Sequence, residues 1–244
     1  MKTLWISHRG ESYDAPQNTI PAFALSQERR THGMECDIHF TADGKVVCIH
    51  DDNTSRVADE TVLIHEKTFE ELQQVDVWNH KEGYKGTRIP LFTDTIKYLG
   101  DDRIYYVEIK GGDLKLVPEL LKIIAESGKP KEQFVMISFW DEVVKLYKEM
   151  APDHKAYLLT GGDPAVEIEE LIARLKNCHA DGIDIGCIGK NIDQAYVDRV
   201  HAEGFEFTVW TIDDPETAEK FLGFGVEAIT SNRAAYLMDM FNGE

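Results

Sequence analysis

The segment IYYVEIKGGDLKLVPELLKIIAES, residues 104–127, contains both of the patterns that decide the fold of this chain. Its first seven residues form a short β-branched and aromatic run, which is typical of a buried strand. After Gly111 and Gly112, apolar residues recur at the spacing of an amphipathic helix. A buried strand followed by such a helix predicts a βα unit, the repeating element of parallel sheets.

The same βα unit recurs along the chain. Strands are expected at 3–7, 33–40, 104–110, 133–139, 155–160, 182–186, 205–212 and 226–231. Helical periodicity follows each strand, most clearly at 114–127, 142–150, 166–177, 194–203 and 216–223. Eight βα units within 244 residues predict an α/β fold, a single (β/α)8 TIM barrel in which residues 1–244 form one domain.

One corner of the predicted barrel departs from this regular pattern. Asp43-Gly44 is a two-residue turn signal, so residues 38–50 are expected to form a hairpin. Residues 51–88 are polar and irregular apart from a short helical pattern at 68–75, and the second helix is expected over 90–99. A connection of this length is unusual and often functional. The sequence therefore predicts a small insertion subdomain, 51–88, after the second strand.

The balance of charge excludes several classes of partner. The chain carries 44 acidic and 26 basic residues, which give a formal net charge of −18. Such a charge repels nucleic acids and anionic lipid surfaces, so we expect neither nucleic-acid binding nor stable membrane association. An anionic substrate would need a local cluster of positive side chains. Nothing in the sequence sets the oligomeric state.

The cysteines and the N-terminus bear on the cellular compartment. Reduced thiols are expected, because no C-x-x-C spacing occurs among Cys36, Cys48, Cys178 and Cys187. A core strand begins within three residues of Met1, without a basic and apolar leader before it. We therefore expect a cytoplasmic protein.

Three carboxylates fall at the ends of the second and third predicted strands, where barrel enzymes place their catalytic groups. Glu35 and Asp37 share one face of a strand because residues two apart point the same way, and Glu108 shares its face with Lys110. Three converging carboxylates suit a hard divalent cation, Ca²⁺ or Mg²⁺, better than zinc. The alternative, salt bridges of Glu35 with Arg9 and of Glu108 with Lys110, would leave one acid uncompensated.

Two histidines and two cations accompany these carboxylates. His8 and His50 lie at the ends of different predicted strands, each followed by polar loop residues. With near-neutral pKa values, one imidazole can accept a proton while the other donates one, as cleavage of a phosphodiester requires. The guanidinium of Arg9 can grip two phosphate oxygens, and the ammonium of Lys110 can neutralise a third. The combination predicts chemistry on a phosphodiester.

Several motifs occur in order at these strand ends. They are HRG at 8–10, APQNTIPAF at 15–23, ECD at 35–37, TADG at 41–44, IHD at 49–51, VEIK at 107–110, ISF at 137–139 and VWTI at 209–212. Together they resemble the sequence blocks of the glycerophosphodiester phosphodiesterase family across essentially the whole chain. Ordered blocks at successive strand ends are far more specific than one short motif.

The resemblance implies the same roles that the residues themselves suggest. The three carboxylates would be the metal ligands, His8 and His50 the acid and base, and Arg9 and Lys110 the phosphate contacts. The family also implies a (β/α)8 barrel with a small inserted subdomain, dependence on Ca²⁺ or Mg²⁺, and hydrolysis of glycerophosphodiesters to sn-glycerol 3-phosphate and an alcohol. The chain departs from the family pattern at Gln17, where Glu is usual, and at Asn232, where Asp is common.

Two further residues are candidates for substrate binding. Asn18 is expected to hydrogen-bond the backbone or a catalytic group, or else to cap the helix that begins near Thr19. Trp210 is placed near a strand end, where it is expected to form a wall for the glycerol or the leaving group rather than part of the core.

The predicted function is metal-dependent hydrolysis of glycerophosphodiesters, a small-molecule substrate class. The attacking group is either water or the neighbouring glycerol hydroxyl, and either histidine can act first. The acidic charge favours a cationic or neutral head group such as choline or ethanolamine. The alternatives are a lysophospholipid- or phosphoinositide-directed phosphodiesterase on the same barrel, a non-catalytic binder of phosphate or metal, and a different barrel enzyme such as a metal-dependent aldolase or isomerase.

Overall fold

The computed structural model describes residues 2–161, 166–186 and 192–242. Eight parallel strands form its sheet: β1 (Leu4–Ser7), β2 (Gly33–Phe40), β4 (Ile104–Ile109), β5 (Phe134–Ser138), β6 (Lys155–Thr160), β7 (Gly182–Gly186), β8 (Glu206–Trp210) and β9 (Ala228–Ser231). Strand β1 pairs with β9 on one side and with β2 on the other, which closes the sheet into a barrel. The predicted (β/α)8 TIM barrel and its eight strands are confirmed.

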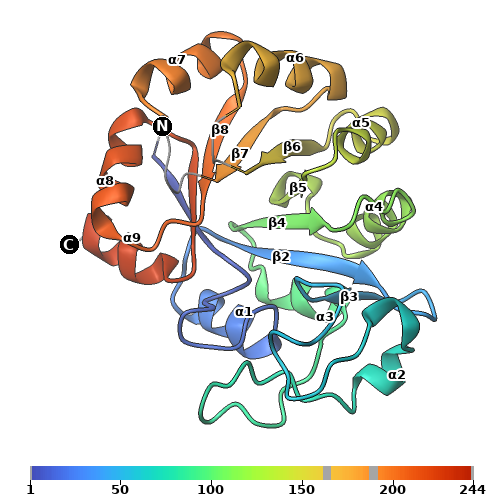
Figure 1. The fold of residues 1–244 in the computed structure, drawn as a ribbon. Coiled ribbons are helices and arrows are strands. Elements are labelled where there is room, and N and C mark those ends of the chain that lie inside the picture. The colour runs from blue at the N-terminus through green and yellow to red at the C-terminus, as the bar shows by residue number, and fades with distance from the viewer. Residues whose placement is uncertain (1, 162–165, 187–191, 243–244) are drawn as a thin grey trace.

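Helices surround the strands as a ring (Figure 1). The α-helices are α1 (Ile20–Glu28), α2 (Phe69–Leu72), α3 (Phe92–Thr95), α4 (Leu116–Glu126), α5 (Asp141–Met150), α6 (Ile168–Cys178), α7 (Gln194–Ala202), α8 (Pro215–Phe224) and α9 (Ala234–Asn242). Short 3-10 helices are η1 (Ile64–Glu66), η2 (Ile96–Tyr98) and η3 (Lys131–Gln133). The five clearest predicted helices correspond to α4–α8, with ends that differ by up to two residues. The helices bury their apolar faces against the outer face of the barrel.

Alternation along the strands separates the two faces of the sheet. In β4, Tyr105, Val107 and Ile109 join the large core between strands and helices, whereas Tyr106 joins a second cluster inside the barrel. That inner cluster, which includes Ile6, fills the barrel below the carboxyl ends of the strands. The polar inward side chains at those ends lie where the site is expected.

The hairpin after β2 is confirmed, whereas the two helices expected beyond it are shorter than predicted. Strand β3 (Val46–Cys48) runs antiparallel to β2. The pattern at 68–75 yields only the four-residue α2, and the helix expected over 90–99 begins at Phe92 and becomes η2 at Ile96. Residues 90–91 stay extended because Cys48 N–H donates to the Pro90 carbonyl and Leu91 bridges Val47.

The insertion packs over a small apolar cluster. It consists of Val47, Ile49, Val57, Ala58, Ile64, Leu72, Val75, Val77 and Ile89, so strand β3 and its flank contribute along with residues 51–88. The insertion therefore shares its core with the hairpin that leads to it, and both lie on the side of the barrel that carries α1 and α3 (Figure 1). Among the described residues no helix is long and apolar enough to cross a membrane. Cys36, Cys48 and Cys178 are free thiols, and Cys187 lies outside the described residues.

Candidate active site

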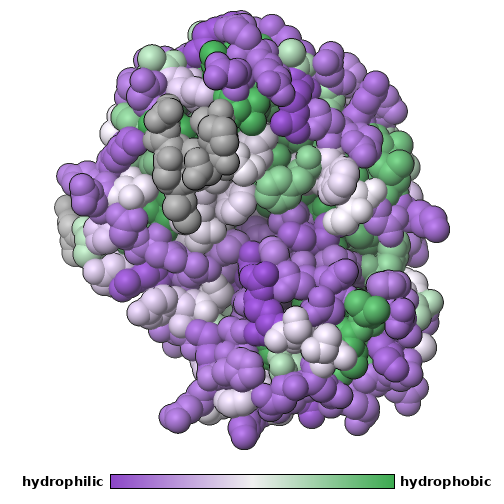
Figure 2. Space-filling view, viewed as in Figure 1, coloured by the Kyte–Doolittle hydropathy of each residue, from purple (hydrophilic) through white to green (hydrophobic). Residues whose placement is uncertain are grey.

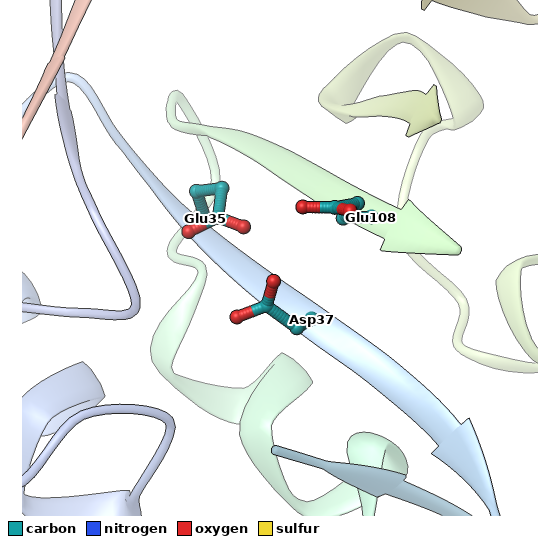
Figure 3. A group of neighbouring side chains, drawn as sticks. All are labelled: Glu35, Asp37 and Glu108. Atoms are coloured by element: carbon teal, nitrogen blue, oxygen red, sulfur yellow. The ribbon is translucent and has the colours of Figure 1, made fainter. Parts of the chain in front are cut away.

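The three predicted carboxylates converge at the carboxyl ends of β2 and β4. Asp37 and Glu108 are partners in the strand register, and Glu35 lies two residues before Asp37 on the same face. Figure 3 shows the three side chains directed toward one another from the two strands. One oxygen of each lies within 4.8 Å of the others, and all three residues are buried.

Burial perturbs the three carboxyl groups in different directions. Burial and then the charge of Asp37 raise the pKa of Glu35 well above its ordinary value, and the same causes raise the pKa of Glu108 to about 8. Burial would also raise the pKa of Asp37, but Arg9 and Lys110 outweigh it and lower that pKa. Asp37 Oδ1 is buried and has no hydrogen-bond donor among the described residues. Three buried carboxylates with a spare oxygen fit a hard divalent cation.

Arg9 reaches two of these carboxylates because the chain turns sharply after β1. Its backbone has a φ of 56°, and the N–H donates to Glu35 Oε2 at 2.8 Å. The next residue, Gly10, has a φ of 75°, and a Cβ there would lie 2.5 Å from the Ala22 backbone, so only glycine fits. The Arg9 Nε lies 3.2 Å from Asp37 Oδ2. Both the backbone and the side chain of Arg9 thus face the carboxylates.

The remaining contacts of the two cations show how their charges are shared. One Arg9 guanidinium nitrogen donates to Gln17 Oε1 at 2.6 Å, a neutral partner that leaves the positive charge uncompensated on that side. Lys110 Nζ lies 2.9 Å from Glu108 Oε1 and 3.5 Å from Asp37 Oδ1. The ion pair of Lys110 with Glu108 is therefore present, whereas Arg9 pairs with Asp37 instead of Glu35.

His8 lies beside the carboxylates with one ring nitrogen held from behind. Its Nδ1 is 2.7 Å from Asn232 Oδ1, and its Nε2 is 4.0 Å from Glu35 Oε2. The Asn232 amide donates to Asp213 Oδ2 at 2.7 Å, so its oxygen must face His8 and accept. The proton of the neutral ring is then on Nδ1, and Nε2 is free to accept one. Burial and then Arg9 lower the pKa of His8 to about 3.

His50 has a charged partner behind it. Its Nδ1 lies 2.6 Å from Asp51 Oδ1, and Asp51 is itself held by Arg56 through two hydrogen bonds. The other nitrogen, Nε2, accepts from Lys110 Nζ at 3.2 Å. Burial lowers the pKa of His50, although Asp37 and Asp51 act in the opposite direction. Both histidines thus present Nε2 to the same group of charges.

Asn18 contacts a predicted metal ligand rather than capping a helix. Its amide nitrogen donates to Asp37 Oδ2 at 2.7 Å, and its oxygen accepts from the Asp37 backbone N–H at 3.2 Å. The N-cap of α1 is Thr19, without a side-chain capping bond. Of the two roles considered for Asn18, the structure therefore shows the contact with a site carboxylate.

A cavity of about 270 Å³ joins these groups. It is lined by His8, Arg9, Glu35, His50, Glu108, Lys110, Ile137, Phe139, Leu159, Asp184, Trp210 and Thr230. Trp210 is therefore a cavity wall, and its ring meets Phe139 edge to face with centroids 5.7 Å apart. In Figure 2, hydrophilic residues gather near the middle of the face, and less hydrophilic ones border them.

Three acids in or behind the site had no predicted role. Asp213 holds Asn232, Asp51 holds His50, and Asp184 lies in the cavity wall. The alternation of the strand GIDIG at 182–186 is a signal that could have identified Asp184, because its side chain is the polar one between two apolar ones. Asp213 lies in the loop after β8, and its contact cannot be read from spacing.

Comparisons with known proteins identify the family of this chain. The family model described as the glycerophosphoryl diester phosphodiesterase family matches residues 8–235. A protein of Caldanaerobacter subterraneus named glycerophosphodiester phosphodiesterase is 30% identical over 246 residues, with 98% of each chain covered. The human protein named glycerophosphodiester phosphodiesterase 1 is 27% identical, covering 89% of this chain and 75% of its own length.

Solved structures show the same fold. An Oleispira antarctica phosphodiesterase, in complex with the product sn-glycerol-3-phosphate, superposes with a TM-score of 0.88 at 23% identity, covering 98% of this chain and 96% of its own. A protein of Agrobacterium tumefaciens also gives a TM-score of 0.88 at 20% identity, with 99% of this chain and 98% of its own covered. From the match over 8–235 and the relative at 30% identity, the chain belongs to the glycerophosphoryl diester phosphodiesterase family.

Proposed function

We propose that this protein hydrolyses glycerophosphodiesters to sn-glycerol 3-phosphate and an alcohol. Membership of the family and the names of the relatives support this activity. The observation that carries it is the single cavity into which two histidines, two buried carboxylates and two cations converge. Hydrolysis of a phosphodiester requires groups that neutralise the phosphate charge and groups that transfer protons at the attacking and leaving oxygens, and this cavity contains both.

We propose Glu35, Asp37 and Glu108 as ligands of one divalent cation, Ca²⁺ or Mg²⁺. The spare oxygen of Asp37 and the proximity of all three carboxylates support this assignment. A cation held there would stabilise the negative charge that develops on a phosphoryl oxygen. Arg9 and Lys110, on either side of Asp37, would neutralise the remaining phosphate charge. Asn18 would keep Asp37 in place through its two hydrogen bonds.

The partners behind the two histidines support different roles for them. His8, with its proton on Nδ1, would act as the general base and take the proton of the attacking group at Nε2. His50 has a carboxylate behind it, which stabilises an imidazolium, so in its protonated form, with a proton on Nε2 in place of the hydrogen bond from Lys110, it would act as the general acid that protonates the leaving alkoxide. Water attack forms the new P–O bond directly. Attack by the glycerol 2-hydroxyl would use the same pair through a cyclic phosphate.

The first test is release of glycerol 3-phosphate from glycerophosphocholine and glycerophosphoethanolamine. We expect activity to disappear on chelation and to return with Ca²⁺ or Mg²⁺. His8→Ala and His50→Ala should each lower kcat by about 10²-fold or more. His65→Ala, at an exposed histidine of η1, is the matched control and should keep activity.

Two outcomes would contradict the proposal. Near-normal turnover of either site variant would remove the acid–base assignment. Turnover of a lysophospholipid without turnover of the small diesters would favour the lipid-directed alternative. Circular dichroism should show that each variant is folded before its activity is compared.

A further inference from the structure

The cavity has two chemically different halves. The half formed by β1, β2 and β4 carries the histidines, carboxylates and cations of the site. The half formed by β5, β6 and β8 presents Ile137, Phe139, Leu159 and Trp210. If the phosphodiester occupies the charged half, the other half receives one of its two ester substituents. The identity of that substituent should follow from the chemistry of the apolar half.

One carboxyl group interrupts the apolar half. Asp184 of β7 is 2% exposed and lines the cavity. Its Oδ1 accepts from Thr208 Oγ1 at 2.8 Å, but no Lys, Arg or His of the described ranges forms an ion pair with it. Burial raises its pKa to about 7. The ionised form of a buried carboxyl group needs a positive group beside it, and the described residues supply none, so a cationic ligand group in the cavity would match it.

Two aromatic rings line the same cavity as this carboxyl group. Trp210 Nε1 donates to the Asp184 backbone carbonyl at 3.1 Å, which fixes the indole on the neighbouring strand. Phe139 meets the indole edge to face, at an interplanar angle of 89°. The indole N–H is thus already used, and the cavity wall offers aromatic surface and one carboxylate but few hydrogen-bond donors. Aromatic rings with a carboxylate are the surroundings that bind an alkylammonium group.

We propose that Asp184, Trp210 and Phe139 form a subsite for the ammonium group of a cationic leaving alcohol, such as a choline or ethanolamine ester. This inference rests on the proposed phosphodiesterase function and specifies its substrate class. A polyol head group would instead need several hydrogen-bond partners, whereas the apolar half offers mainly ring and aliphatic surface. The subsite selects by charge, because a ring–carboxylate pair gains little from an uncharged group of the same shape.

The test compares glycerophosphocholine with the diester that carries 3,3-dimethylbutanol in place of choline. The two esters have the same shape and differ only in the positive charge. With the metal-loaded protein we expect kcat/KM to favour the choline ester by about tenfold or more. Asp184→Asn should lower kcat/KM for the choline ester by about tenfold and leave the neutral ester within about twofold. Thr230→Val, which removes a hydroxyl from the same cavity, should leave the ratio of the two esters unchanged.

Other results would overturn the proposal. Equal hydrolysis of the two esters by the wild-type protein would mean that no ammonium subsite exists, although the phosphodiesterase function would stand. Equal loss of both substrates in Asp184→Asn would place Asp184 against the glycerol or in the packing. Calorimetric titration with choline gives a readout that needs no turnover. The wild-type protein should bind choline, and Asp184→Asn should not. Absence of choline binding to the wild-type protein would also overturn the subsite.

Discussion

Asn232 decides which nitrogen of His8 carries the proton. Its Oδ1 faces His8 because its amide nitrogen donates to Asp213, which can only accept as a carboxylate. Asp213 is fixed in turn by the Asn232 backbone N–H at 2.8 Å and by Ser231 Oγ at 2.9 Å. Asn232 therefore still provides an acceptor for His8, as the more common Asp would. The negative charge, however, lies on Asp213, the next residue in the hydrogen-bonded chain behind His8.

We predict that Asn232→Ala lowers kcat about tenfold to a hundredfold and changes KM little. Without the acceptor, His8 can rotate or take the other tautomer, so fewer molecules present a free Nε2 to the attacking group. The exchanged pair, Asp213→Asn with Asn232→Asp, keeps every hydrogen bond of the chain from Asp213 to His8 and should restore most of the activity. Steady-state kinetics with glycerophosphocholine measure both effects.

A matched control separates this positioning role from local packing. Ser12 Oγ donates to the same Asn232 oxygen at 2.8 Å without touching His8. Ser12→Ala removes this one hydrogen bond and leaves the bond between Asn232 and His8 in place. It should therefore leave kcat within about threefold of the wild-type value. Failure of the exchanged pair to recover activity, with both proteins folded, would show that Asn232 does not act through the orientation of His8.

The three carboxylates can be predicted from the sequence because their placement depends on short spacings. Glu35 and Asp37 are two residues apart on one strand, and the same alternation identifies Glu108 on the next, so their convergence follows from strand geometry. The contact between His8 and Asn232 spans 224 positions and exists only when β9 lies beside β1. No local pattern contains that information, and the role of Asn232 could only be seen in the closed barrel.

Strand β1 depends on a hydrogen bond with His32, a residue outside the strand. The Trp5 backbone N–H donates to His32 Nδ1 at 3.0 Å, and the His32 carbonyl accepts from the first residue of β4, Ile104. His32 thus links the start of β1 to β4 below the site. Nδ1 can accept only in the neutral ring. Burial, followed by the charges of Lys2 and Arg103, lowers the pKa of His32.

This linkage predicts that stability falls in mild acid. A pKa that is lower in the folded than in the unfolded state contributes stability above the unfolded value of about 6.5, and this contribution is lost as the pH falls through the lowered folded pKa. His32→Asn keeps an acceptor oxygen near the Nδ1 position and does not titrate. The free energy of unfolding of the wild type relative to His32→Asn should therefore decrease between about pH 7 and pH 5.

Urea denaturation at several pH values measures this difference. His65→Asn, at an exposed histidine, is the control and should run parallel to the wild type over the same range. If the difference in the free energy of unfolding between the wild type and His32→Asn did not depend on pH, protonation of His32 would not be linked to folding.

Elements differ in how far the sequence predicts them. The eight strands are predictable because each is a short buried run between helices of clear periodicity, as the segment 104–127 illustrates. The helix expected over 90–99 starts late because Leu91 pairs with Val47 of β3 and because Pro90 keeps its neighbours extended. The apolar spacing over 90–99 is that of a helix, but the pairing of Leu91 with β3 prevents the helix from beginning before Phe92. The pattern at 68–75 ends early in the same way, within an insertion whose apolar cluster includes β3.

Burial of three neighbouring carboxylates costs the whole barrel folding free energy. Glu35, Asp37 and Glu108 lie together on β2 and β4, where Arg9 and Lys110 form ion pairs with Asp37 and Glu108, in a chain whose net charge is already −18. Like charges in a buried cluster repel, and a protein that binds a cation only when folded is stabilised by it. The proposed metal is therefore expected to act on the stability of the whole barrel as well as on catalysis.

We predict that saturating Ca²⁺ or Mg²⁺ raises Tm by about 5–10 °C over the chelated protein. A ligand at about a hundred times its Kd contributes about 2.7 kcal/mol, and each kcal/mol shifts Tm by about 2–4 °C in a domain of this size. Differential scanning calorimetry should show the shift in the wild type and its loss in Asp37→Asn. Glu11→Gln also removes a buried carboxyl group, but one that pairs with Ser7 and Arg29 away from the cluster, so this variant should keep the shift. An equal shift in Asp37→Asn would place the cation elsewhere, because Asp37 is one of its three proposed ligands.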